Sequence, residues 1–339
     1  MTQVLKVPGT KIHKPEPQAP NHANGQFGRV LLFCGSGSTG LGAAIADHLR
    51  IETGRYTRTV FPNENIFIRL NQSVRGQDVY LVQSMCSPIH DHIFEMLVMI
   101  DTLKRDSAGR INLVIPYMPY ARSDKKDQPR VGIAARLLAN MIEVAGADRY
   151  ITIDLHAGQI QGFFNIPGDA LTAFHLLSDY MADKAIENLV VCSTDLGFAK
   201  KARNWALRLD APLAIIEKRR SGNDSKAEAL AIIGDVKDRN VLLVDDEVLT
   251  GGSVLNAVNL LRSEGARDLY LAFTHAGLAA AAVERLAEAG FKEIITTDTL
   301  PLLADLRLPN MTILSVAPML GEVITRAHEG RSVGELFDE

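Results

Sequence analysis

The stretch VLLVDDEVLTGGS, residues 241–253, contains the transition that decides the fold. Its apolar run predicts a buried strand over residues 240–245, and the amphipathic pattern that follows predicts a helix near residues 253–264. Between them, the glycines let backbone N–H groups approach an anion, while Thr250 and Ser253 add hydroxyl donors at the start of the helix. This order of strand, glycine-rich loop and helix predicts a phosphate-binding loop at the carboxyl end of a strand.

Similar apolar runs alternate with helical patterns along most of the chain, which is typical of a parallel sheet flanked by helices. In the first half, we expect strands at residues 29–33, 78–83, 111–116 and 149–154, with helices near 40–50, 89–105 and 132–145. In the second half, we expect strands at 189–193, 212–217, 240–245 and 268–274, with helices near 197–209, 253–264 and 278–289. The chain is therefore predicted to be an α/β protein with two similar halves.

The polar stretch IPGD, residues 166–169, marks the expected boundary between these halves. We therefore expect one domain over residues 28–166 and a second over residues 167–339. Residues 1–27 contain no apolar signal segment and are predicted to form a mobile extension.

The composition limits the possible functions of the 339 residues. A formal net charge of −4 gives no reason to expect nucleic acid as a partner. No apolar run reaches the roughly 18 residues of a membrane helix, so we expect a cytoplasmic protein. The three cysteines, Cys34, Cys86 and Cys192, are far apart in the sequence and are interpreted as buried residues rather than a disulfide framework.

Two acids follow the strand of the phosphate loop. Asp245 and Asp246 could hold ribose hydroxyls or a metal-bound water. A simpler interpretation is that Asp and Gly residues only cap a strand-to-helix corner. Two acids, two glycines and two hydroxyls exceed what a cap requires, so we favour a binding function.

A second glycine-rich corner, GSGSTG at residues 35–40, fits the dinucleotide fingerprint G-x-G-x-x-G. A dinucleotide site would need an acidic residue at the end of the next strand, about 20 residues further on. Glu64 lies 24 residues after Gly40, but not at a clean strand end. The dinucleotide interpretation is therefore disfavoured.

Several longer stretches resemble one known family, the ribose-phosphate pyrophosphokinases, over about residues 28–339. They are SVRG at 73–76, PYMPYARSDKKD at 116–127, DLHAGQIQGFF at 154–164, IIEKRR at 215–220 and GDVKDR at 234–239. The resemblance implies two phosphoribosyltransferase-type domains, the first binding ATP and the second binding ribose phosphate. It also implies transfer of the diphosphate of MgATP to ribose 5-phosphate, which gives phosphoribosyl diphosphate and AMP.

The resemblance also implies functions for individual residues. Lys218 and Arg220, which open a polar flap over residues 221–228, are the implied catalytic cations on the transferring phosphates. The implied ligands of Mg²⁺ are His156, Asp195 and Asp154. The implied ribose-phosphate-binding residues are Asp245, Asp246, Leu249, Thr250, Gly251, Gly252 and Ser253. The implied ATP-binding residues are Phe61, Asn63, Glu64, Asn65, Arg122, Ser123 and Asp127.

In this family, the adenine-binding hairpin around residues 61–65 reaches into the site of a neighbouring subunit. The resemblance therefore implies a homo-oligomer built from dimers, often a hexamer.

Some positions depart from the family pattern. Asn65 stands where a Glu is usual, with Glu64 one place early, and Ser123 replaces a usual Gln. Phe198 stands where the second of two glycines is usual, and Leu249 replaces a usual Asp. Since a charged hydrogen bond is worth about 1.5–3 kcal/mol, Leu249 predicts weaker binding of ribose 5-phosphate or a different acceptor sugar phosphate.

Three functions therefore stay open beside the main one. The chain could be a divergent paralogue with another acceptor, or a catalytically weak regulatory subunit of an active pyrophosphokinase. A phosphoribosyltransferase would share the phosphate loop, but it has no use for the cations at residues 218–220 or for the DLHA stretch.

Overall fold

The computed structural model describes residues 27–220 and 228–336. The expected mobile extension, up to residue 26, and residues 221–227 of the expected flap lie outside the described residues.

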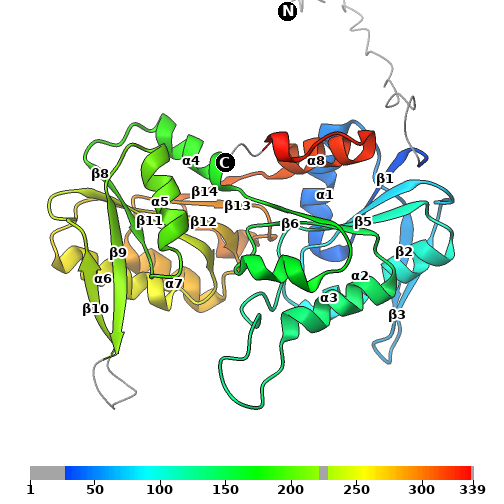
Figure 1. Ribbon diagram of the computed structural model, residues 1–339, viewed down its shortest axis with the longest axis horizontal. Coiled ribbons are helices and arrows are strands. Elements are labelled where there is room, and N and C mark those ends of the chain that lie inside the picture. Colours follow the sequence, from blue (N-terminus) through cyan, green and yellow to red (C-terminus); the bar gives the residue numbers. More distant parts are fainter. Residues whose placement is uncertain (1–26, 221–227, 337–339) are drawn as a thin grey trace, which may run out of the picture.

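The described part of the first half contains a five-stranded parallel sheet in the order β1-β4-β5-β6-β7 (Figure 1). Strand β4 is buried at every residue, and β5 and β6 are buried at every residue after the first, which explains why these strands read as apolar runs in the sequence. A separate antiparallel hairpin, β2–β3, projects from this half. The bounds are β1 (Val30–Cys34), β2 (Tyr56–Val60), β3 (Ile66–Leu70), β4 (Asp78–Val82), β5 (Arg110–Ile115), β6 (Arg149–Ile153) and β7 (Gly168–Leu171).

The described part of the second half contains a seven-stranded sheet in the order β10-β9-β8-β11-β12-β13-β14. All neighbouring strands are parallel except β9 and β10, which form an antiparallel hairpin. The bounds are β8 (Leu189–Ser193), β9 (Leu213–Arg220), β10 (Glu228–Ile233), β11 (Asn240–Val248), β12 (Leu269–Ala276), β13 (Glu293–Thr297) and β14 (Met311–Leu314).

Helices cover both faces of the two sheets. In Figure 1, α1, α4, α5 and α8 lie above them, whereas α2, α3, α6 and α7 lie below. The bounds are α1 (Thr39–Leu49), α2 (Ile89–Arg105), α3 (Ala134–Ala145), α4 (Phe174–Asp183), α5 (Ala199–Arg208), α6 (Gly252–Ser263), α7 (Ala280–Ala289) and α8 (Ala317–Glu329). Short 3₁₀ helices are η1 (Ser36–Ser38), η2 (Gly158–Phe163), η3 (Ala304–Leu306) and η4 (Gly334–Leu336).

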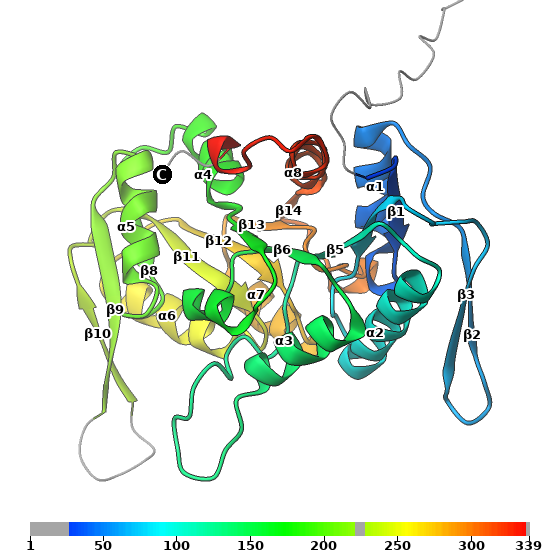
Figure 2. The same cartoon turned by 45° about the vertical axis from the view of Figure 1, so that its right-hand side comes forward.

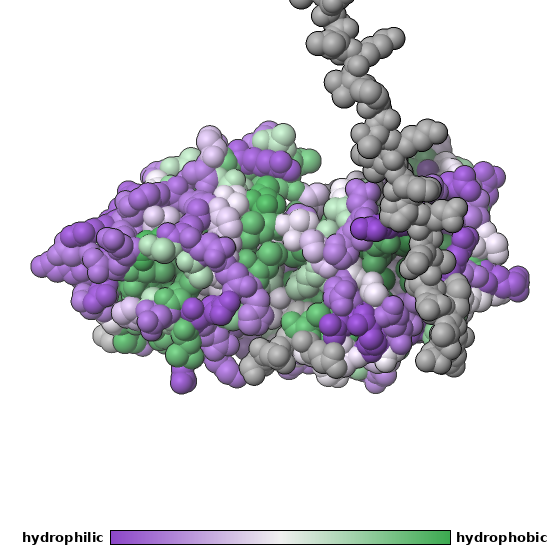
Figure 3. Space-filling view, turned by 90° about the horizontal axis from the view of Figure 1, so that it is seen from above, coloured by the Kyte–Doolittle hydropathy of each residue, from purple (hydrophilic) through white to green (hydrophobic). Residues whose placement is uncertain are grey.

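One hydrophobic core continues through both halves on the upper face. It joins Leu32 and Ile45 of the first half to Leu242 and Tyr270 of the second, with Leu320 of α8 in the same cluster. Seen from above, hydrophobic side chains gather in a strip between the halves, whereas hydrophilic side chains cover much of either end (Figure 3). The halves therefore share apolar packing, which holds their sheets in a defined relation.

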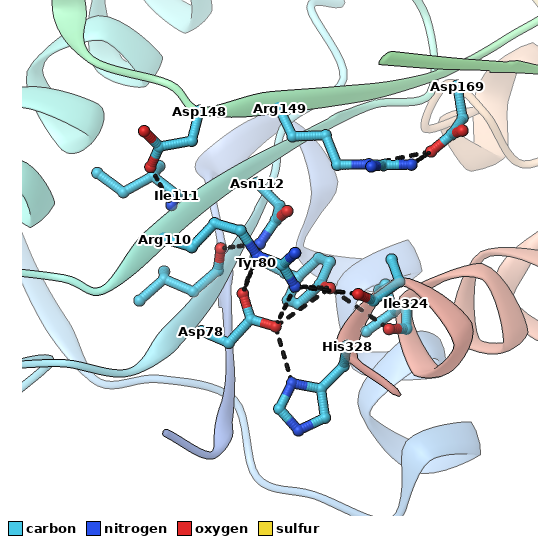
Figure 4. A network of polar contacts seen from close by, with 12 residues as sticks. Asp78, Tyr80, Arg110, Ile111, Asn112, Asp148, Arg149, Asp169, Ile324 and His328 are labelled. Carbon is cyan, nitrogen blue, oxygen red and sulfur yellow. Dashed lines mark hydrogen bonds and ion pairs between the residues drawn. The ribbon is translucent and has the colours of Figure 1, made fainter. Parts of the chain in front are cut away.

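The last helix, α8, returns to the first half and is held there by polar contacts (Figure 4). His328 Nδ1 lies 2.8 Å from Oδ2 of Asp78, and Arg110 donates to the backbone oxygen of Ala327 at 3.1 Å. The helix also lies close to α1, because a Cβ on Gly321 would stand 2.4 Å from the ring of His48. Only glycine allows this approach.

The predicted α/β class with parallel sheets flanked by helices is confirmed. The predicted elements lie within a few residues of the observed ones, and the helix at residues 89–105 and the strand at 189–193 match fully. The pattern missed β2, β3, β7, α4, β10, β13, β14 and α8, and only the family resemblance indicated the hairpin that β2 and β3 form. The first sheet also continues past the expected boundary after residue 166, because β7 pairs with β6. The division into domains stays a prediction. Among the described residues, no helix is long and apolar enough to cross a membrane.

Candidate active site

The carboxyl ends of strands from both sheets meet between the two halves. Strands β8, β11 and β12 run parallel, so their ends lie at one edge of the second sheet. The loops that follow β5 and β6 reach this edge from the first half, where Arg122 contacts Glu247 and His156 contacts Asp246. Ligands of open α/β sheets bind at such edges, so this junction is the candidate site.

The acids at the end of β11 form the centre of the site. Asp245 accepts hydrogen bonds from the Thr194 hydroxyl at 2.6 Å and from the backbone N–H of Asp246 at 2.8 Å. Burial, together with the neighbouring Asp246 carboxylate, raises the pKa of Asp245 to about 7. Burial alone would also raise the pKa of Asp246, but the hydrogen bond and charge of His156 outweigh it and lower the value to about 2. The pair therefore carries a negative charge that favours binding of a cation.

His156 could hold a metal ion at this centre. Its Nδ1 lies 2.7 Å from Oδ2 of Asp246, and this bond raises the pKa of the imidazole. Holding one ring nitrogen with a carboxylate leaves the other to face a metal, which is common at metal sites. Within the described ranges, no group of three or more His, Cys, Asp or Glu side chains is arranged to hold a metal ion. Mg²⁺ usually takes few protein ligands beside substrate phosphates, so a site of this kind still fits it.

The other two expected metal ligands have different surroundings. The Asp154 carboxylate accepts hydrogen bonds from Thr172, from the backbone N–H of Ala173 and from Thr274, and so joins the two halves. Asp195 is exposed, and its carboxylate accepts a bond of 2.9 Å from the backbone N–H of Phe198 at the start of α5. Their function as metal ligands stays a prediction.

The phosphate loop has the predicted geometry. Gly251 has a φ of 70°, which favours glycine, and α6 begins directly after it at Gly252. Arg285 of α7 donates to the backbone oxygen of Thr250 at 2.6 Å and so holds the turn. Leu249 packs over Gly277, where a Cβ would stand 2.5 Å from its Cδ2 atom.

The loop after β5 holds the expected ATP-binding residues of the first half other than the hairpin. Arg122 donates to Glu247, and 58% of its side chain is exposed. The hydroxyl of Ser123 instead accepts the backbone N–H of Ala134 at 3.2 Å, at the start of α3. Asp127 is exposed further along the loop.

The expected catalytic cations Lys218 and Arg220 lie in the last residues of β9, and their side chains lie outside the described part of the structure. Strands β9 and β11 both run parallel to β8, so residue 218 and the turn at Thr250 lie at the same edge of the sheet. Figures 1 and 2 both show the β9–β10 hairpin and the loop after β5 projecting from one side of the molecule.

The expected adenine-binding residues Phe61, Asn63, Glu64 and Asn65 lie in the turn between β2 and β3. Phe61 is about half exposed, and Glu64 has a φ of 67° within the turn. Figures 1 and 2 show this hairpin at the opposite end of the molecule from α6 and the β9–β10 hairpin. Within one protomer, the structure therefore does not bring the hairpin to the acids.

A cleft of about 700 Å³ adjoins the acids. Its walls combine His156 and Asp246 with the aromatic side chains of Phe174, Phe198 and Trp205. Phe198, which departs from the family pattern, thus lies on the wall of the cleft rather than away from the site.

Several residues of the site were not predicted from the sequence. Tyr117 and Glu247 bond each other across the halves at 3.1 Å, Thr194 bonds Asp245, and Arg285 holds the phosphate loop. Glu247 was the easiest to find, because it directly follows the two predicted acids, and Tyr117 lies in the quoted stretch at residues 116–127. Thr194 and Arg285 carry no local signal.

Comparisons with known proteins identify the family of the chain. A model described as the N-terminal domain of ribose phosphate pyrophosphokinase matches residues 30–146, and one described as the phosphoribosyl synthetase-associated domain matches residues 221–338. The ribose-phosphate pyrophosphokinase of Nostoc sp. is 44% identical over 91% of this chain and 94% of its own length. That of Oceanobacillus iheyensis is 45% identical over 91% of this chain and 97% of its own.

A crystal structure of phosphoribosylpyrophosphate synthetase from Mycobacterium smegmatis gives a TM-score of 0.85 at 43% identity. The match covers 89% of this chain and 99% of the mycobacterial chain. The fold, with two mainly parallel sheets, and these comparisons together define a diphosphotransferase. The chain belongs to the ribose-phosphate pyrophosphokinase family.

Proposed function

We propose that this chain transfers the diphosphate of MgATP to ribose 5-phosphate, giving phosphoribosyl diphosphate and AMP. Family membership supports the reaction, and one structural observation carries the assignment to this site. The acids Glu247 and Asp246 of the second half meet Arg122 and His156 of the first half at one edge, the edge at which the predicted phosphate loop also lies. Two substrates bound from opposite halves would therefore meet there, and positioning is the largest part of phosphoryl-type transfer.

Each group of residues has a function in the proposed reaction that follows from its chemistry. The turn at residues 250–253 binds the 5-phosphate through backbone N–H groups at the start of α6. Asp245 and Asp246 bind ribose hydroxyls, and Arg122 binds the phosphates of ATP. Lys218 and Arg220 stabilise the transferring phosphates.

His156, fixed by Asp246, is the best-supported protein ligand for Mg²⁺, with Asp195 and Asp154 as further candidates. When bound, the ion neutralises negative charge on the phosphates. Ser123 and Asp127 complete the ATP-binding loop.

We further propose that the site is completed in a homo-oligomer built from dimers, such as a hexamer. The hairpin residues Phe61, Asn63, Glu64 and Asn65 would then bind adenine in the site of a neighbouring subunit. Their position at the far end of the protomer supports this arrangement. We also propose that the protein is located in the cytoplasm.

The experiment is to incubate the purified chain with MgATP and a panel of pentose phosphates, and to follow AMP and sugar diphosphate by mass. We expect AMP with ribose 5-phosphate, and a second acceptor used better would identify the divergent function that Leu249 favours. A Lys218→Ala chain purified in the same way should lose at least about 100-fold activity, which excludes a contaminating host enzyme. Release of no AMP with any sugar would refute the catalytic function and favour the regulatory one.

A further inference from the structure

Glu247 is a buried acid of the site to which no function has yet been assigned. It lies near the carboxyl end of β11, paired with His275 of β12, and only 5% of its side chain is exposed. Its two oxygens have different partners: Oε1 accepts from Arg122 and Oε2 accepts from the hydroxyl of Tyr117 at 3.1 Å. Both partners belong to the loop after β5, so one carboxylate of the second half holds the nucleotide loop of the first.

Arg122 is held in a particular way. Its Nε donates to Glu247 and, within residues 27–220 and 228–336, neither of its two terminal nitrogens has a hydrogen-bond acceptor. Burial alone would lower the pKa of the guanidinium, but the charge of Glu247 outweighs it and raises the value. A guanidinium anchored at Nε keeps a pair of terminal nitrogens for phosphate oxygens, and its exposed side chain leaves them accessible.

Tyr117 fixes the carboxylate from the other side. Its ring packs edge-on against His275, with ring centroids 5.0 Å apart at 64°. Burial and the charge of Glu247 raise the pKa of Tyr117, so its hydroxyl keeps the proton that it donates. Glu247 therefore has little freedom to rotate away from Arg122.

We propose that Glu247 is a positioning residue for the nucleotide: by holding Nε of Arg122 it aims the two terminal nitrogens at the phosphates of MgATP. The inference rests on the proposed function, in which Arg122 binds ATP. This arrangement also makes nucleotide binding depend on the junction of the two halves, because Arg122 comes from the first half and Glu247 from the second.

The test is a double-mutant cycle of Glu247→Gln and Arg122→Ala, with the Kd of a non-hydrolysable magnesium ATP analogue measured by calorimetry. Glu247→Gln keeps the shape but removes the charge, and we expect the Kd to rise about tenfold, which corresponds to about 1.4 kcal/mol. In the Arg122→Ala background, the same change should raise the Kd less than about twofold, because there is no guanidinium left to aim.

Kinetics separate positioning from a structural function. We expect Glu247→Gln to raise KM for MgATP with little change in kcat or in KM for ribose 5-phosphate. Glu288→Gln, at an exposed position of α7, is the matched control and should change none of these values. Tyr117→Phe, which loses only the hydroxyl on Oε2, should give an effect in the same direction but smaller.

An equal effect of Glu247→Gln in both backgrounds, or no effect on the Kd, would overturn the inference. Should Glu247→Gln not fold, Glu247→Asp withdraws the carboxylate by one methylene and must show the same dependence on Arg122. The analogue Kd needs no turnover, so a wild-type chain that binds it but forms no AMP would contradict the proposed function and not this inference.

Discussion

Asp78 and the acids Asp246 and Glu247 are buried carboxylates at contacts between the two halves, and Asp245 lies partly buried beside the latter pair, but the surroundings of the two groups differ. Asp78 accepts two hydrogen bonds from Arg110, one from Asn112 and one from His328 (Figure 4). Burial alone would raise its pKa, but His328 and Arg110 outweigh it and lower the pKa. The opposite result at Asp245, a pKa raised to about 7, shows that its charge is not balanced in the same way.

The difference teaches what each cluster is for. A buried carboxylate whose charge and lone pairs are satisfied by the protein fixes one arrangement of chain segments, here α8 on the first half. Adjacent acids repel each other, which lowers the stability of the fold but favours the binding of a cation between them. We therefore propose that the first cluster stabilises the fold and that the second serves function, and substitutions should separate the two.

The largest effect is expected from Asp246→Asn. The change removes the charge that orients His156, and we expect kcat/KM for ribose 5-phosphate to fall about 1000-fold, or about 4 kcal/mol. Stability should change by less than about 1 kcal/mol, because His156 is half exposed and repulsion by Asp245 is relieved. Steady-state kinetics and urea unfolding of the same preparation check both values, and a large loss of stability would assign Asp246 to the fold.

Asp78→Asn should lower the stability of the fold and leave the activity unchanged. It leaves the largely buried Arg110 without its countercharge, and we expect the free energy of unfolding to fall by about 3 kcal/mol at pH 7. The folded fraction should keep its kcat and both KM values. Urea unfolding followed by circular dichroism measures the loss, and an unchanged midpoint would show that the network contributes nothing to stability.

At acidic pH, Asp78→Asn should no longer lower the stability of the fold. The pKa of Asp78 is lower in the folded chain than its ordinary value of 3.8. Its contribution to stability is therefore present above about pH 4 and is lost as the pH falls toward the folded-state value. Calorimetric Tm values of wild type and Asp78→Asn should converge below pH 4, and a difference that grows with acid would contradict the assignment.

The smallest effect is expected from Leu249→Asp in the phosphate loop. A carboxylate there could accept a ribose hydroxyl, so KM for ribose 5-phosphate should fall about tenfold, a gain of about 1.4 kcal/mol. Because Leu249 packs over Gly277, we expect a loss of about 1 kcal/mol in stability. Initial-rate kinetics over a range of ribose 5-phosphate test this, and a raised KM would show that this acceptor is not the natural one.

Much of the site was predictable because its signals are local. The acids, the glycines and the helix start of the phosphate loop are consecutive, so their shared position after a strand follows from the chain order. Tyr117 and Arg122 were visible in the sequence, but their common partner Glu247 lies 130 and 125 residues away. The pairing of β7 with the first sheet and the return of α8 carry no local signal either.

The order of apolar runs, glycines and acids determined the α/β class and the phosphate loop, because backbone conformation responds to neighbouring residues. The tertiary structure alone decided which buried charges are balanced. Asp78 meets His328 across 250 residues, and Glu247 meets Arg122 between the two sheets. Burial and charge pairing depend on distances in space, so the same residue type can stabilise the fold at one junction and, as we propose, support binding at the other.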